Sequence, residues 1–64
     1  MERIKIFSTV VLDDGREGDV VDIYTSPSLG YGIDFTRADQ PIPDPMYEIV
    51  TPEKVTSVLW EPKE

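Results

Sequence analysis

The sequence predicts a small all-β domain with five short strands and one turn of 3₁₀ helix before the last strand. Polar and apolar residues alternate with the period of a strand in several short segments, and glycine, proline and aspartate separate these segments. The 64 residues leave room for one domain, 1–64, and contain neither a repeat nor a low-complexity tract. A chain of this length buries only about 60% of its unfolded surface, so its stability is expected to be marginal and a deep cleft is not expected.

The first two predicted strands are joined by an acidic turn. Thr9–Leu12 is a β-branched stretch of the kind that half-buried strands favour. Asp13–Gly15 ends it, because aspartate seeds turns and glycine accepts a positive φ. The next strand is Gly18–Tyr24, and simple alternation places Val21 and Ile23 on one face.

The third predicted strand, Tyr31–Phe35, has the clearest alternation in the chain. Its tyrosine, isoleucine and phenylalanine point one way, whereas Gly32 and Asp34 point the other. We therefore expect the three large side chains in the core, together with Phe7. Gly32 either lets a neighbouring strand or a partner's backbone approach closely or permits a sharp bend.

The last third of the chain begins with a segment that cannot be a central strand. Thr36–Pro45 has three prolines within Pro41–Pro45, and proline lacks the N–H group that a ladder needs. We expect a long, stiff loop or an edge there. Met46–Val50 is the fourth predicted strand, Thr51–Lys54 has the threonine cap and the following proline of a single 3₁₀ turn, and Val55–Trp60 is the fifth strand. This order is expected of an SH3-like barrel.

Three motifs add a family resemblance over roughly Val10 to Leu59. The chain resembles small uncharacterised bacterial proteins that consist of one SH3-like barrel, through Gly18-x-Val20-Val21-x-Ile23-Tyr24, Tyr31-x-Ile33-Asp34-Phe35 and Val50-Thr51-Pro52-Glu53-Lys54-Val55. The resemblance implies an accessory or immunity-type binder encoded near a toxin, phage or other mobile element, and it transfers no catalytic residue. The proline-rich loop departs from the family pattern.

A second resemblance, to the KOW-type barrels of ribosomal and transcription proteins, is carried by Arg16-x-Gly18-x-Val20-Val21. Those barrels usually present a basic surface. Here thirteen acidic residues stand against six basic ones, for a net charge of −7, which repels phosphate backbones. We therefore expect no nucleic acid partner.

The composition also limits the chemistry and the location. The sequence has no cysteine and no histidine, which removes disulfides, thiol nucleophiles, the usual zinc ligands and the commonest general base. No apolar run approaches the roughly 20 residues that cross a bilayer, and the start of the chain has no signal-peptide pattern. We expect a cytoplasmic protein with no membrane partner, no cofactor and no enzymatic activity.

The acidic turn and its glycines suggest two sites that we do not expect. Its carboxylates could hold calcium, but their spacing is not that of an EF-hand loop and Arg16 lies among them. Gly15 and Gly18 are too few and wrongly spaced for a phosphate-binding loop, so they are predicted to serve a turn and a strand entry. The four acidic residues are Asp13, Asp14, Glu17 and Asp19.

Three aromatic residues are the candidates for protein binding: Tyr24, Tyr47 and Trp60. SH3-like barrels often bind extended or proline-containing peptides on aromatic side chains at loop mouths, although such rings can also simply close the barrel ends. Pro41–Pro45 could instead be a ligand for another module. The alternative to a binder of another protein is self-assembly with a copy of the chain, through an edge strand formed by the alternating residues Arg3–Ile6.

Overall fold

The computed structural model describes residues 4–63, which form one antiparallel sheet of five strands. The elements are β1 (Thr9–Leu12), β2 (Glu17–Tyr24), β3 (Gly30–Asp34), β4 (Tyr47–Val50), the 3₁₀ helix η1 (Pro52–Lys54) and β5 (Val55–Trp60). The prediction of an all-β chain with a 3₁₀ turn before the last strand is confirmed. Each strand begins and ends within one residue of its predicted bounds.

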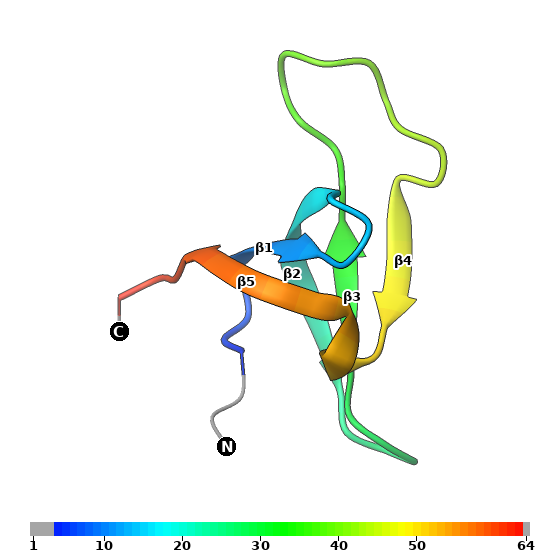
Figure 1. Cartoon of the computed structure of the whole chain (residues 1–64), viewed down its shortest axis with the longest axis vertical. Coiled ribbons are helices and arrows are strands. Elements are labelled where there is room, and N and C mark those ends of the chain that lie inside the picture. The colour runs from blue at the N-terminus through cyan, green and yellow to red at the C-terminus, as the bar shows by residue number, and fades with distance from the viewer. Residues whose placement is uncertain (1–3, 64) are drawn as a thin grey trace.

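The strands lie in the order β4-β3-β2-β1-β5. In Figure 1, β3 and β4 run side by side along the long axis of the molecule, and β1 and β5 run across them. The two edge strands β4 and β5 are joined through η1 and not by a ladder, so the sheet is open. Closure into an SH3-like barrel therefore stays a prediction.

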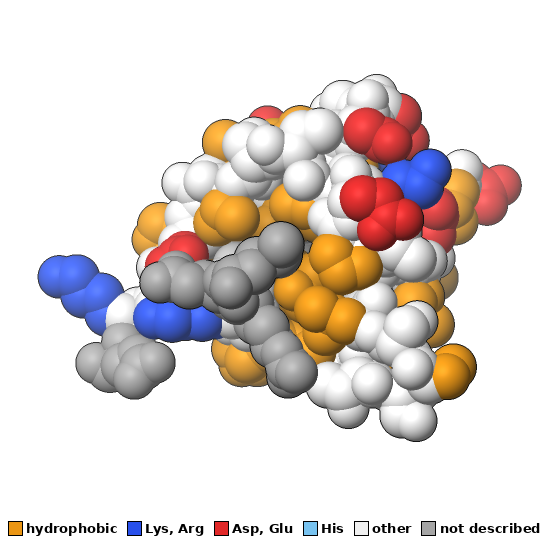
Figure 2. Space-filling model, turned by 60° about the horizontal axis from the view of Figure 1, so that its bottom comes forward, with side chains coloured by type: hydrophobic (Ala, Val, Ile, Leu, Met, Phe, Trp, Pro, Cys, Tyr) orange, Lys and Arg blue, Asp and Glu red, His pale blue; other side chains and the backbone are white. Residues whose placement is uncertain are grey.

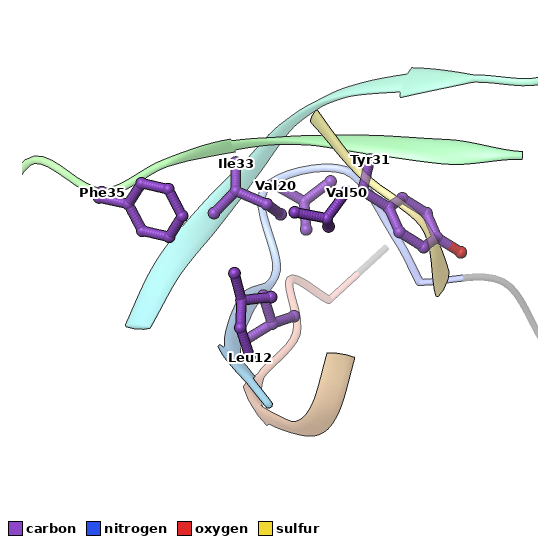
Figure 3. Close-up of a cluster of buried hydrophobic side chains, with 7 residues drawn as sticks. Leu12, Val20, Tyr31, Ile33, Phe35 and Val50 are labelled. Carbon is purple, nitrogen blue, oxygen red and sulfur yellow. The ribbon is translucent and has the colours of Figure 1, made fainter. Parts of the chain in front are cut away.

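The core lies between the crossing strands, where side chains from β1 meet those of β2, β3 and β4. Figure 3 shows the side chains of Tyr31 and Ile33, on β3, and of Phe35, which follows it, on the same side of the chain as Leu12. Tyr31, Ile33 and Phe35 are 2%, 0% and 6% exposed, which confirms the predicted face. The buried apolar residues are Val10, Leu12, Val20, Tyr31, Ile33, Phe35 and Val50.

The segment before β1 differs from the prediction. Ile4–Ile6 is not a strand, because the Ser8 amide donates to the Lys5 carbonyl and closes a turn. Phe7 has a φ of 72° and is 62% exposed, so the prediction that it belongs to the core is wrong. Its amide donates to the carbonyl of Val20, and this bond fixes the backbone while the ring stays outside. Arg3, the first residue of the predicted edge strand, lies outside the described residues.

A bulge in β2 changes the face that Val21 was predicted to share with Ile23. Val20 lies opposite Ile33, and Asp22 lies opposite Gly32, so Val21 is the extra residue on β2. The inward face therefore carries Val20 and Ile23 in place of Val21 and Ile23. Val20 is completely buried, and Ile23 packs against the core from its margin.

Ser8 puts an unpartnered hydroxyl in this core. Ser8 is completely buried, and its Oγ has no hydrogen-bond partner among residues 4–63. A buried polar group without a partner costs about 1–3 kcal/mol.

We therefore expect Ser8→Ala to leave the free energy of unfolding unchanged or raise it by up to about 1 kcal/mol, measured by urea denaturation. Thr9→Val is the matched control: the Thr9 hydroxyl donates to Asp19 Oδ1 at 2.8 Å, so its loss should cost about 1 kcal/mol. A larger loss from Ser8→Ala than from Thr9→Val would contradict this account of the buried hydroxyl.

Candidate functional site

The surface of β2, β3 and β4 that faces away from the core is built on two glycines. Residues directly opposite one another in antiparallel strands share a face. The register places Tyr24 opposite Gly30 on one side of β3, and Ile49 opposite Gly32 on the other. Side chains of β2 and β4 can therefore approach each other over β3. We call this surface the outer face; it carries Asp22, Tyr24, Gly30, Gly32, Asp34, Tyr47 and Ile49.

Tyr24 and Tyr47, two of the three predicted binding residues, meet on the outer face. Their hydroxyl oxygens are 3.2 Å apart and hydrogen bonded, although 23 positions separate them in the chain. The Tyr47 hydroxyl also donates to Asp22 Oδ2 at 2.9 Å. The pair thus joins β4 to β2 across β3.

Gly32 makes this arrangement possible. A Cβ atom there would collide with the phenol end of Tyr47 and would stand 3.0 Å from Cβ of Asp22. Gly32 was predicted either to allow a close approach or to permit a sharp bend. The structure shows a close approach, by the side chain of Tyr47 from the neighbouring strand β4.

The Tyr47 phenol is held in its neutral form. The hydrogen bond with Tyr24, partial burial and the carboxylate of Asp22 raise the pKa of Tyr47 above the usual range of a tyrosine. The rings remain accessible, since Tyr24 is 42% exposed and Tyr47 is 38% exposed. The outer face therefore offers two hydrogen-bonded rings beside a carboxylate.

Trp60, the third predicted residue, lies elsewhere. It ends β5, where it is opposite Thr9 of β1, and it is 57% exposed. Since β5 and β4 are the opposite edges of the sheet, Trp60 is not part of the tyrosine pair. It belongs to a different surface.

The acidic turn is occupied by ion pairs. Asp14 Oδ2 accepts from Arg16 Nε at 2.7 Å, and Asp13 is 3.8 Å from the Lys54 ammonium. The backbone amide and the guanidinium of Arg16 lower the pKa of Asp14 below its usual value. Asp19 instead accepts from Arg37 at 3.0 Å. Within residues 4–63, no three carboxylates converge in a way that could hold a metal ion.

Arg16 is a structural residue that sequence reasoning missed. Its Nη1 lies 3.0 Å from Glu48 Oε1, and its guanidinium carbon stands 4.5 Å from the centre of the Phe35 ring. A cation above an aromatic face is attracted by the ring's negative quadrupole. Arg16 therefore closes one end of the core and ties the first turn to β4. The only signal in the sequence is a single cation within an acidic turn.

Charge is unevenly distributed over the surface. Figure 2 shows apolar side chains gathered at the centre of one view and acidic side chains clustered around a basic one at its right. Three of the described basic side chains, those of Arg16, Arg37 and Lys54, are paired with carboxylates.

The proline-rich segment was predicted to be either a long, stiff loop or an edge strand. It lies in the loop between β3 and β4. In Figure 1 this loop extends beyond the end of the sheet. Ile42, between two of the prolines, is 75% exposed.

Comparison of the chain with models of protein families, with curated proteins and with solved structures finds no match. The described residues form no helix that is long and apolar enough to span a membrane.

Proposed function

We propose that this chain is a non-catalytic protein-binding module, an SH3-like barrel whose outer face holds an extended segment of another protein. The observation that carries the proposal is the hydrogen-bonded pair Tyr24–Tyr47, exposed over the glycines of β3. Two rings held in place by each other lose little conformational entropy when a ligand packs on them. Their hydroxyl groups add fixed polar contacts.

The chemistry of the outer face favours a segment that contains proline and a basic residue. Proline-rich segments are already extended, so they pack on exposed aromatic rings at little entropic cost. Asp22 beside the rings, and the net charge of −7, favour a cation on the ligand. Ile49, 57% exposed on the same face, supplies an apolar contact next to the rings.

Two further considerations support a binder over an enzyme or a nucleic acid module. The chain has neither cysteine nor histidine, and carboxylates of the acidic turn are paired with cations. Arg16, Arg37 and Lys54, three of the six basic residues in the sequence, are engaged in ion pairs with carboxylates. The bacterial proteins that the chain resembles point to an accessory or immunity-type role in the cytoplasm, encoded on a mobile element.

The test is a titration of fluorescently labelled, proline-rich peptides with and without arginine, followed by polarisation. We expect binding of the arginine-containing peptide and at least about a tenfold loss of affinity for Tyr24→Ala, the size of effect typical of an aromatic anchor. Ile42→Ala, which removes an exposed apolar side chain from the β3–β4 loop, is the control that should leave the affinity unchanged.

Two results would contradict the proposal. One is peptide binding that Tyr24→Ala and Tyr47→Ala do not weaken, provided that both variants keep the wild-type circular dichroism. The other is a salt-sensitive shift of labelled RNA or DNA at 0.15 M salt, which would favour a KOW-like module instead.

A further inference from the structure

The β5 edge, residues 55–60, is an open strand edge without a charged side chain. Within residues 4–63, its other side pairs with β1, and it ends the sheet. The sequence there is Val-Thr-Ser-Val-Leu-Trp, rich in residues that favour strands. Val58, Leu59 and Trp60 are 40%, 54% and 57% exposed. An unpaired edge of this composition is a template for another strand.

The charges on either side of the β5 edge favour a second copy of this chain as that strand. Glu53 and Lys54 precede it, and Glu61, Lys63 and Glu64 follow it. Antiparallel pairing of two copies brings the residues before β5 in one copy next to those after β5 in the other. Both flanks contain acidic and basic residues, so opposite charges of the two copies can meet there, despite a net charge of −7 on each.

The opposite edge of the sheet, β4, is not suited to pairing with a second copy. β4 is only four residues long and carries Glu48 in its middle, so self-pairing would place the glutamates of two copies close together. Glu48 is also engaged by Arg16. Self-association is thus favoured at one edge only, which gives a closed pair and not a growing fibre.

We propose that two copies of this chain associate through β5, antiparallel about a two-fold axis, so that their sheets become one continuous sheet. The edge that the sequence suggested at Arg3–Ile6 is thereby replaced by β5. The register between β1 and β5 shifts twice, between Thr9 and Val10 and between Val11 and Leu12. These irregularities shorten the stretch that can pair regularly, so the dimer should be weak and reversible.

The inference is independent of the proposed peptide site. The tyrosine pair lies on β2 and β4, and β1 separates these strands from β5, so a dimer can form whether or not the outer face binds peptide. Each proposal can fail alone.

Trp60 gives a direct measurement, because it is the single tryptophan of the chain and lies in β5. We expect sedimentation velocity to show a dimer that dissociates on dilution, with a shift of Trp60 emission to longer wavelength over the same concentrations. Added salt should strengthen the dimer, since it screens the repulsion between two acidic copies. A chain that stays monomeric to about 1 mM, a concentration at which even weak association is detected, would overturn the proposal.

Leu59→Glu and Ile49→Glu form a matched pair, since the two side chains are 54% and 57% exposed on opposite edge strands. Leu59→Glu puts two like charges into the dimer contact and should raise the dissociation constant at least tenfold, whereas Ile49→Glu should change it less than twofold. Thermal denaturation checks that both variants fold. Equal weakening by the two substitutions, or weakening by Ile49→Glu alone, would place the contact elsewhere and overturn the proposal.

Discussion

Phe35→Ala is expected to unfold the protein or nearly so. Removal of a buried phenylalanine costs about 3–5 kcal/mol, which is most of the stability that a domain of this size has. The Phe35 ring is 6% exposed and also supports the Arg16 guanidinium, whose partner Glu48 lies on β4. Urea denaturation followed by circular dichroism measures the loss.

Asp34→Ala, one position earlier, is the control. The Asp34 carboxylate accepts bonds from the amide and the hydroxyl of Thr36, at 2.9 and 2.7 Å. These bonds lower the pKa of Asp34. Because Asp34 is only half-buried, we expect a cost of about 1 kcal/mol. A carboxyl group whose pKa is lower in the folded state than in the unfolded state stabilises the fold at pH values above its unfolded pKa. The cost of Asp34→Ala should therefore shrink as the pH falls through the pKa of Asp34 in the folded state. If Phe35→Ala and Asp34→Ala lowered the free energy of unfolding equally at neutral pH, the assignment of Phe35 to the core and of Asp34 to the opposite face would be wrong.

Gly18→Ala is expected to have the second largest effect. Gly18 is buried in β2, and a Cβ atom there would collide with the Ile33 side chain and stand 2.9 Å from the Asp34 carbonyl oxygen. That oxygen belongs to the backbone of the paired strand β3, so it cannot move without disturbing the ladder. We expect a loss of about 3 kcal/mol, the upper end of the usual cost of overpacking, measured as a lower denaturation midpoint.

Gly32→Ala is the matched glycine. Its Cβ would meet mainly the phenol end of Tyr47, which can turn away, so the cost in stability should be smaller. The same substitution should break the contact between the tyrosines and weaken peptide binding. If Gly32→Ala destabilised the fold more than Gly18→Ala, the packing described for the two positions would be wrong.

Local patterns predicted the five strands of the sheet to within one residue, but the alternation at Arg3–Ile6 also predicted an edge strand that residues 4–6 do not form. Alternation over Tyr31–Phe35 identified the core face, and Asp13–Gly15 identified the turn, where Gly15 has a φ of 91°. Such signals lie within a few neighbouring residues. The bulge at Val21 left no comparable signal, because two adjacent valines fit either register.

The features that the sequence could not supply depend on contacts between distant residues. Tyr24 and Tyr47 were proposed as binding residues separately, but their contact follows only from the positions of β2 and β4 on either side of β3. The exposure of Phe7 depends on a turn whose bond to Val20 is likewise non-local. For the same reason an edge strand was expected at Arg3–Ile6, whereas the edges of the sheet formed by residues 4–63 are β4 and β5.

The long loop between β3 and β4 is closed at its base. The Phe35 amide donates to the Met46 carbonyl at 2.9 Å, so the two ends of the loop are held together before the prolines begin. Doubling the length of a flexible loop adds only about 0.6 kcal/mol to the entropy of closing it. This segment is therefore a natural place to insert an epitope, a tag or a second domain: the graft would extend from the tip of the loop, and the bond at its base would separate it from the sheet.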